Sequence, residues 1–266
     1  VLTSQLFKTA SEASVSVQAA SDQNKRRIVL VGTGGRGTGF WGKTLLSNFG
    51  QNIEFVGLCD TNPGRLMYAK EKIGVSCPTS ENFDQLINQV KPDMIIVTTP
   101  DSLHHEYIIK GLRFGADVVT EKPMTTDEKK CKAILDAEKK AKGKLIVGFN
   151  YRYINTFTRL KELVQGGDVG PITSVDFHWY LNTYHGADYF RRWHGLRKYS
   201  GTLLVHKATH HFDLLNWILD SDPLEVVAYG GLEHYGRNNP FRHTHCRTCP
   251  HKDKCQYYFD ITKNEG

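Results

Sequence analysis

Three glycines that follow a short apolar run constrain the fold of this chain most. The run covers residues 26–31, and the turn Gly32-Thr33-Gly34-Gly35-Arg36-Gly37 follows it directly. A short, continuous apolar run is typical of a buried parallel strand, and residues 38–49 carry a helical pattern. The spacing G-x-G-x-x-G between a strand and a helix predicts a tight turn whose backbone approaches phosphate groups at the helix N-terminus.

Strand and helix signals alternate along the first half of the chain. Further strands are expected at four apolar runs, residues 53–60, 93–98, 117–121 and 145–149. Helices are expected at the amphipathic patterns between them, residues 63–73, 82–90, 103–114 and 127–141. Such alternation predicts βαβ units and a doubly wound parallel sheet of α/β class, here over residues 25–150.

A different pattern follows in residues 151–266. Helices are expected at 155–165 and 207–219, and strands at 172–182 and 224–232. This order predicts an α+β domain with a large open, mostly antiparallel sheet, of which this chain would hold only part. Residues 1–24, rich in Ser, Ala and Gln, are expected to form an N-terminal arm outside both domains.

Composition excludes some classes of protein. Of the 266 residues, 39% are hydrophobic and 23% are charged, as in ordinary globular proteins. Acidic and basic residues are interspersed, so the net charge of +6 favours an anionic small molecule and does not indicate nucleic acid. Because no apolar stretch reaches the ~20 residues of a membrane helix, no membrane association is expected.

The six cysteines bear on location and on metal binding. They are not spread like a disulfide scaffold, so we expect a cytoplasmic protein, with export left open because the chain begins at Val1. Cys246, Cys249 and Cys255 cluster within segment 243–256. A neighbouring histidine (His243, His245 or His251) would complete a structural zinc site. An iron–sulfur cluster, a disulfide and free thiols are the alternatives.

An acidic residue at the end of the second strand narrows the ligand. Asp60 lies 23 residues after Gly37, where a carboxylate accepts hydrogen bonds from the adenosine ribose of NAD. Arg65 lies about one helical turn later and would suit a 2′-phosphate, so NADP stays possible. The turn residues Gly32, Gly34, Gly35, Arg36 and Gly37 are the predicted pyrophosphate site.

The segment Glu121-Lys122-Pro123 follows the strand at 117–121. Ligands bind at the carboxyl ends of strands in such sheets. A lysine there can polarise a substrate oxygen, and a cis peptide before Pro123 would aim Lys122. The alternative is a surface lysine before a turn proline.

Several segments together resemble one family. They are the glycine turn, Asp60, residues 98–104, Glu121-Lys122-Pro123, residues 148–152 and the helix from Gly201 to Asp213. Over roughly residues 26–232 the chain is similar to the Gfo/Idh/MocA oxidoreductases (glucose–fructose oxidoreductase, inositol dehydrogenase and relatives). The resemblance implies a Rossmann domain, an α/β substrate domain, bound NAD(P), a carbohydrate-like substrate, and a dimer or tetramer formed through the C-terminal sheet.

The resemblance also implies roles for single residues. Lys122 and His210 match the catalytic lysine and histidine, and both would touch substrate. Thr99, Pro100, Leu103 and His104 match the loop on the nicotinamide side. Glu121 and Asn150 are then expected near the cofactor, and Arg152, at the start of the substrate domain, near the substrate.

The chain departs from the family pattern at one position. Seven residues before Asp213, where many members carry Asp, it has His206, followed by Lys207. On a helix, His206 and His210 would share a face. A basic face of this kind would suit an acidic or highly hydroxylated substrate.

Aromatic residues and histidines dominate residues 178–194. Aromatic faces stack on sugar rings, while Arg and His bind hydroxyl and carboxylate groups. Tyr184, Arg192 and His194 are the predicted substrate contacts, and a packed or oligomeric surface is the alternative.

These features predict an NAD(P)-dependent oxidoreductase that transfers hydride to or from a hydroxyl-bearing carbon of a sugar, polyol or sugar acid. One alternative is a glycoside hydrolase that uses a transient NAD redox cycle. A second is a non-catalytic NAD(P)-binding sensor or scaffold, against which Lys122 and His210 argue.

Overall fold

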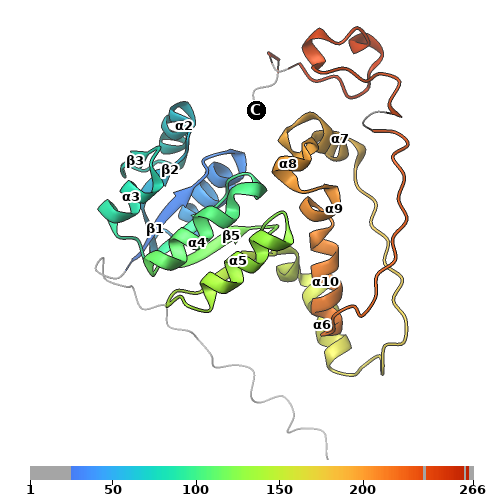
Figure 1. Ribbon diagram of the computed structural model, residues 1–266, viewed down its shortest axis with the longest axis horizontal. Helices are drawn as coiled ribbons and strands as arrows, with labels where there is room; N and C mark the ends of the chain where they lie inside the picture. Colours follow the sequence, from blue (N-terminus) through green and yellow to red (C-terminus); the bar gives the residue numbers. More distant parts are fainter. Residues whose placement is uncertain (1–24, 236–237, 261, 264–266) are drawn as a thin grey trace, which may run out of the picture.

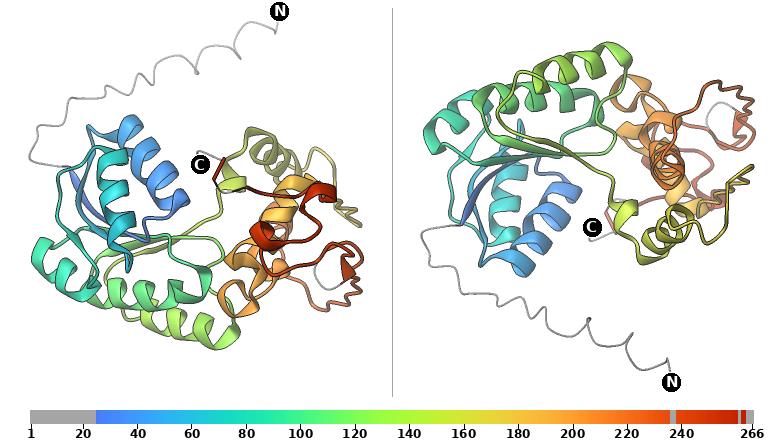
Figure 2. Two further views of the ribbon diagram at one scale, coloured as in Figure 1. Left: turned by 90° about the horizontal axis from the view of Figure 1, so that it is seen from above. Right: turned by 90° about the horizontal axis from the view of Figure 1, so that it is seen from below.

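The computed structural model describes residues 25–235, 238–260 and 262–263. Two halves lie side by side, with the sheet in the first half and α6, α9 and α10 in the second (Figure 1; Figure 2). The predicted N-terminal arm, residues 1–24, lies outside the described residues. None of the described helices is long and apolar enough to cross a bilayer.

The first half contains one six-stranded parallel sheet. Its strands are β1 (Arg26–Val31), β2 (Ile53–Cys59), β3 (Thr79–Ser80), β4 (Met94–Val97), β5 (Asp117–Glu121) and β6 (Leu145–Gly148). Their order is β3-β2-β1-β4-β5-β6, and every neighbouring pair is parallel. The predicted doubly wound sheet is therefore confirmed. The order reverses between β1 and β4, which opens a crevice at the carboxyl ends of these strands.

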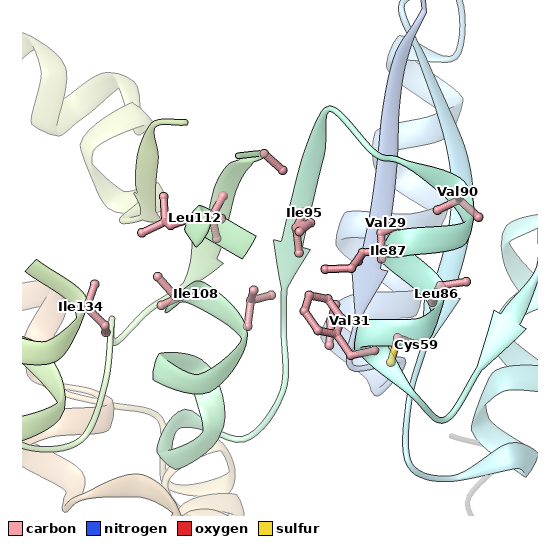
Figure 3. Packing of buried hydrophobic residues seen from close by; sticks show 14 residues of the cluster. Val29, Val31, Cys59, Leu86, Ile87, Val90, Ile95, Ile108, Leu112 and Ile134 are labelled. Atoms are coloured by element: carbon pink, nitrogen blue, oxygen red, sulfur yellow. The ribbon is translucent and has the colours of Figure 1, made fainter. Parts of the chain in front are cut away.

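Both faces of the sheet are buried under helices. Val29 and Val31 point into a cluster with residues of α3, α4 and α5 (Figure 3). Ile28 and Leu30 point to the other side, into a cluster with residues of α2. Because successive side chains of a strand alternate between faces, a continuous apolar run at β1 supplies both clusters.

The helices of this half are η2 (Arg36–Thr44), α1 (Leu45–Phe49), α2 (Pro63–Ile73), α3 (Phe83–Val90), η3 (Asp101–Leu103), α4 (His104–Phe114) and α5 (Glu128–Glu138). The side chains of Asn62, Asn82 and Asp127 cap α2, α3 and α5 by accepting from backbone amides of the first turn. η2 is a π-helix at the start of the predicted first helix. Such turns are rare and recur at functional sites.

The second half is helical where it is regular. Its elements are η4 (Asn150–Tyr153), α6 (Asn155–Gln165), α7 (Thr183–Arg191), η5 (Trp193–Gly195), α8 (Arg197–Ser200), α9 (Leu203–His206), α10 (Thr209–Leu219), η7 (Cys246–Thr248) and η8 (Lys252–Lys254). The helix predicted at 207–219 begins only at Thr209. His206 ends a separate helix, so His206 and His210 do not share one helical face.

The two strand predictions in this half are wrong. Residues 172–182 and 224–232 are not assigned to strands, and within the described ranges no antiparallel sheet forms. A strand is stabilised by hydrogen bonds to a neighbouring strand, and neither segment is paired with a strand in the described part of the chain. Their alternating apolar side chains, such as Val175, Leu224 and Val226, are exposed instead of covered.

Candidate active site

The glycine turn after β1 is shaped by close backbone packing. Gly32 has φ +86°, and a Cβ there would lie 2.7 Å from the backbone of Thr98. A Cβ on Gly37 would lie 2.1 Å from the carbonyl oxygen of Gly32. Around Gly34 and Gly35, by contrast, an added Cβ would meet nothing within 4 Å. The turn therefore offers open backbone at its middle, which fits the approach of a pyrophosphate.

Asp60 supports this turn from the end of β2. One carboxylate oxygen accepts from the amide of Thr33 at 2.7 Å and from its hydroxyl at 3.1 Å, and the other accepts from the amide of Asn62 at 2.9 Å. Asp60 is buried, and a carboxylate has acceptor sites left for a ribose hydroxyl. Arg65 lies nearby on α2 with an exposed side chain.

A cleft of about 410 Å³ lies between the carboxyl ends of the strands and the second half. The predicted site residues that line it are Arg36, Thr99, His104, Glu121, Lys122, Asn150, Arg192, His194, His206 and His210. The structure adds Thr98, Asp101, Tyr151, His185, Asp188, Tyr189, Trp193 and Lys207. The structure thus gathers both halves around the residues that the family resemblance singles out.

Lys122 enters the cleft from the loop after β5. Its ammonium donates to the carbonyl oxygen of His206 at 2.9 Å, a link between the two halves. Burial is the main influence on this lysine and lowers its pKa, while Asp101 and Glu121 oppose that shift. The Lys122–Pro123 peptide is cis, as considered from the sequence.

Glu121 is held on the opposite side of the same loop. One of its carboxylate oxygens accepts from Arg36 Nε and from Trp41 Nε1, each at 2.6 Å. Both donors belong to η2, so this buried carboxylate ties the glycine-turn helix to β5. A bond between an ionised acceptor and a charged donor is stronger than a neutral one.

His104 joins the loops after β4 and β5. Its ring nitrogens lie 2.8 Å from the carbonyl oxygen of Pro123 and 2.9 Å from that of Thr99. The ring is buried, and burial lowers its pKa. These contacts hold the Thr99 loop and the Lys122 loop at a fixed separation.

His210 lies on the far wall of the cleft, near the start of α10. Its ring stacks on Tyr151, with centroids 4.0 Å apart and planes at 9°. Burial and the neighbouring Lys122 and Lys207 lower its pKa to about 3, so the imidazole is neutral at neutral pH. Lys207 donates to the Tyr151 hydroxyl at 2.9 Å, which holds the stacked ring in place.

Within the cleft, the shortest polar contact between the two halves joins His206 to Asp101. His206 Nδ1 lies 2.5 Å from Asp101 Oδ2, and both side chains are buried. Nothing in the local sequence pairs residues that are 105 positions apart.

Two predicted substrate contacts lie elsewhere. Arg152 does not line the cleft; its guanidinium donates twice to Asp213, at 2.9 and 2.5 Å. Tyr184 is 65% exposed and packs edge-on against Tyr257. The Arg152 side chain is engaged inside the second half and the Tyr184 side chain faces solvent, so neither lies in the cleft, and their roles in substrate binding stay predictions. Pro100 and Leu103 flank the cleft loop and do not line the cleft.

The cleft residues absent from our predictions had weak signals. Asp101 lies inside the matched segment 98–104, but a carboxylate beside a turn is common. Tyr151 lies between Asn150 and Arg152, which were predicted site residues. Tyr189 and Trp193 belong to the aromatic stretch at residues 178–194. The sequence shows that stretch without showing which of its rings turn inward.

The cysteine segment does not form the predicted zinc site. All six cysteines are free, and no group of three metal-type ligands occurs in the part of the chain that the structure describes. Cys249 is buried, and its thiol points to the carbonyl oxygen of Phe241 at 3.9 Å. The 3₁₀ turns η7 and η8 hold the segment without bringing its sulfur atoms together.

Family models match both halves of the chain. Residues 26–149 match the oxidoreductase family with an NAD-binding Rossmann fold, and residues 161–258 match the C-terminal α/β domain of the same family. The chain belongs to the Gfo/Idh/MocA oxidoreductase family. The family resemblance inferred from the glycine turn, the Glu-Lys-Pro segment and the Gly201–Asp213 helix is thereby confirmed.

Individual family members are similar over most of this chain. YteT of Bacillus subtilis, whose name describes it as an oxidoreductase, is 42% identical over 88% of this chain and 57% of its own length. An inositol 2-dehydrogenase/D-chiro-inositol 3-dehydrogenase of Lactiplantibacillus plantarum is 26% identical over 73% of this chain and 53% of its own. The chain spans about half the length of the curated relatives it matches.

A solved structure shares both the fold and some sequence. The WlbA dehydrogenase of Bordetella pertussis, in complex with NADH and UDP-GlcNAcA, superimposes with a TM-score of 0.64 at 28% identity. The alignment covers 75% of this chain and 57% of that protein. Membership in an NAD-binding family agrees with the open glycine turn and with Asp60.

Proposed function

We propose that this chain binds NAD(H), with NADP as the weaker fit, and supports hydride transfer to or from a hydroxyl-bearing carbon of a sugar, polyol or sugar acid. Residues 25–150 would bind the cofactor, and residues 151–266 would bind the substrate. The observation that carries the proposal is the convergence of Lys122 and His210 in one cleft, beside a glycine turn with open backbone. The inositol and sugar-acid names of the relatives support the substrate class.

The residues of this chain divide the work of such a reaction. The bound dinucleotide would supply or accept the hydride at its nicotinamide ring. The amides after Gly34 and the Arg36 guanidinium would hold its phosphates, and Asp60 a ribose hydroxyl. His104 fixes the Thr99 loop against the Lys122 loop, so the reacting groups would meet a preformed surface.

Lys122 and His210 would act on the substrate hydroxyl. The Lys122 ammonium, held by one hydrogen bond to the His206 carbonyl, has further donors for a developing alkoxide. His210 is neutral because its pKa is lowered to about 3, so its imidazole would orient the substrate hydroxyl through a hydrogen bond. Removing water from the hydroxyl would strengthen both interactions in this partly buried cleft.

The test is a screen of polyols, sugars and uronic acids for NADH formation, with variants assayed on the best substrate. Lys122→Ala is expected to lower kcat by about 10²–10⁴-fold, the range of a positioned acid–base or electrostatic group. Lys132→Ala, an exposed lysine on α5 paired with Asp136, is the matched control and should act as wild type.

Three outcomes would redirect the proposal. Activity that survives Lys122→Ala would remove the assignment of this lysine. Release of product from an aryl glycoside without NADH accumulation would indicate the redox-cycling glycoside hydrolase instead. Tryptophan-fluorescence quenching by NAD, with no turnover in either assay, would indicate a sensor or scaffold.

A further inference from the structure

The contact between Asp101 and His206 crosses from one half of the chain to the other. Asp101 opens η3, in the loop that follows β4, and His206 ends α9. His206 Nδ1 lies 2.5 Å from Asp101 Oδ2. Both residues are buried: 8% of the surface of His206 and 3% of that of Asp101 are exposed. A short bond between an imidazole and a carboxylate holds one proton for two bases.

We propose that Asp101 and His206 work as one acid–base unit of the cleft, in which His206 Nε2 exchanges a proton with the substrate hydroxyl and Asp101 positions the ring and takes up its second proton. This inference rests on the proposed function. It assigns His206 as a catalytic residue beside Lys122 and His210, and Asp101 as a positioning residue.

The geometry selects the nitrogen that can react. With Nδ1 committed to Asp101, only Nε2 is left for a ligand. Among the described residues no hydrogen-bond partner of Nε2 is found, and His206 lines the cleft. The His206 backbone also matters, because its carbonyl oxygen receives the Lys122 ammonium. Ring and backbone thus connect this one residue to both loops of the sheet edge.

A carboxylate stays in the cleft although position 206 is not acidic. The family resemblance implies Asp where this chain has His206. In this chain the carboxylate of Asp101, in η3, contacts the His206 ring instead. A carboxylate–imidazole pair keeps one negative charge near Lys122 and adds a nitrogen base, so the substitution alters the site without removing its acid–base capacity.

The groups that face the pair come from every element packed around it. They are Glu121 of β5, Lys122 after it, His104 at the start of α4, His185 and Tyr189 of α7, His194 of η5, Lys207 after α9, and His210 of α10. Burial is the main cause that raises the pKa of Asp101 to about 7 and lowers that of His206 to about 3. The pair therefore gains its extra proton near neutrality, as one unit.

When a hydroxyl is oxidised, one proton enters the pair from the substrate and a second proton moves within the pair. The substrate O–H bond breaks and an N–H bond forms at His206 Nε2. The Nδ1–H bond breaks and an O–H bond forms at Asp101 Oδ2, so the pair changes from one negative charge to none. The hydride would go to the nicotinamide dinucleotide of the proposed function, and water would remove the proton afterwards. Reduction reverses each step.

Nuclear magnetic resonance of the free chain tests the shared proton without turnover. With ¹⁵N-labelled histidine, His206 Nε2 is expected to lose its proton near pH 7 in the wild type. Asp101→Asn still offers a hydrogen-bond partner to the ring but cannot take a proton, so the transition should move at least one pH unit toward acid. An unchanged transition in this variant would overturn the inference.

Kinetics test the role of the pair in the reaction. Asp101→Asn should lower kcat for oxidation about 10²-fold, with KM within about threefold, and should move the acid limb of the pH profile. A purely structural Asp101 would leave that limb in place. Circular dichroism melts of each variant show whether a loss of activity is a loss of folding.

A double substitution at the two positions tests whether the two groups depend on each other. His206→Asp alone places two buried carboxylates together and should impair folding or activity strongly. Adding Asp101→Asn leaves one carboxylate and one amide, so the double variant should fold better and be more active than His206→Asp alone. A double variant no better than His206→Asp would overturn the inference. A wild type without NADH formation but with the resonance transition intact would remove the proposed function and not the proton-sharing pair.

Discussion

The two halves of this chain are stabilised in different ways. Both hydrophobic clusters are built from residues between Ile28 and Ile134, on the two faces of the parallel sheet. In the second half the buried side chains include Ser200, His206, Lys207 and His210, with few large apolar residues among them. The first half is therefore a self-contained core, whereas the second half is ordered largely by polar contacts around the cleft.

The strongest test of this difference is a matched pair of leucines. Leu30 is fully buried in β1, and Leu224 is fully exposed. Leu30→Ala removes buried apolar contacts on a closely packed sheet face and should lower the free energy of unfolding by about 2–5 kcal/mol. Leu224→Ala should change it by about 0.5 kcal/mol or less. Urea titrations followed by circular dichroism measure both.

The same urea titrations test whether the exposed side chains of the second half contribute little to stability. If Leu224→Ala cost as much as Leu30→Ala, residues 224–232 would be packed in solution. That result would contradict the view that polar contacts largely order the second half. A small effect of Leu30→Ala would instead contradict the assignment of β1 to the centre of the core.

The difference also explains what the sequence could predict. Five of the six strands of the sheet were predictable, because buried parallel strands are continuous apolar runs, as at 26–31 and 93–98. The strand β3 (Thr79–Ser80) was not predicted, because two polar residues form no such run. Lys122 and His210 could be placed through the family motifs around them. The strands at 172–182 and 224–232 were wrongly predicted, because alternation shows a preference for one face without supplying the neighbouring strand.

Long-range polar pairs were not predictable from the sequence. Asp101 meets His206, and Arg152 meets Asp213, through a folded arrangement that no local pattern encodes. Arg152 was assigned to substrate because it begins the second half, yet its partner lies 61 residues away. Charged side chains choose partners by the final geometry, so type and spacing alone leave several options open.

The second test breaks a polar link inside the second half. Arg152, in η4, donates both its Nε and an Nη to Asp213 of α10, whose side chain is nearly buried. Arg152→Met should destabilise by about 1–3 kcal/mol, because a buried carboxylate loses its donors. Arg159→Met is the control, since its pair with Glu162 is exposed and worth about 0.5 kcal/mol at most.

Hydrogen exchange would locate this damage. Faster exchange is expected in α6 and α10, which pack together, with β1 and β4 unchanged. Equal acceleration in both halves would mean that the link stabilises the whole chain. That result would weaken the distinction between a self-contained core and a half ordered by polar contacts.

The smallest expected effect comes from pH. Burial lowers the pKa of His194 and of His210 to about 3, below the value near 6.5 of an unfolded histidine. As pH falls below about 6.5, the unfolded chain takes up protons that the folded chain excludes, so stability falls. Asp101, with a pKa raised to about 7, acts in the opposite direction and offsets His206, whose pKa is also lowered to about 3. The remaining histidines whose pKa is lowered, His104, His194, His210 and His211, all act in the same direction and therefore decide the sign.

Thermal melts at pH 7.5 and pH 5.5 should differ by about 3–6 °C, with the lower Tm at pH 5.5. The double variant His194→Gln/His210→Gln should reduce this difference, because it removes two of the groups that the folded chain keeps unprotonated. As the pH falls, amide hydrogen exchange, corrected for its intrinsic pH dependence, should become faster first in residues 193–219. Three of the histidines whose pKa is lowered by burial, His194, His206 and His210, lie in the second half, whereas His104 lies in the first. Acid should therefore loosen the polar half before the apolar core, and a simultaneous loss in both would show that the two halves unfold as one unit.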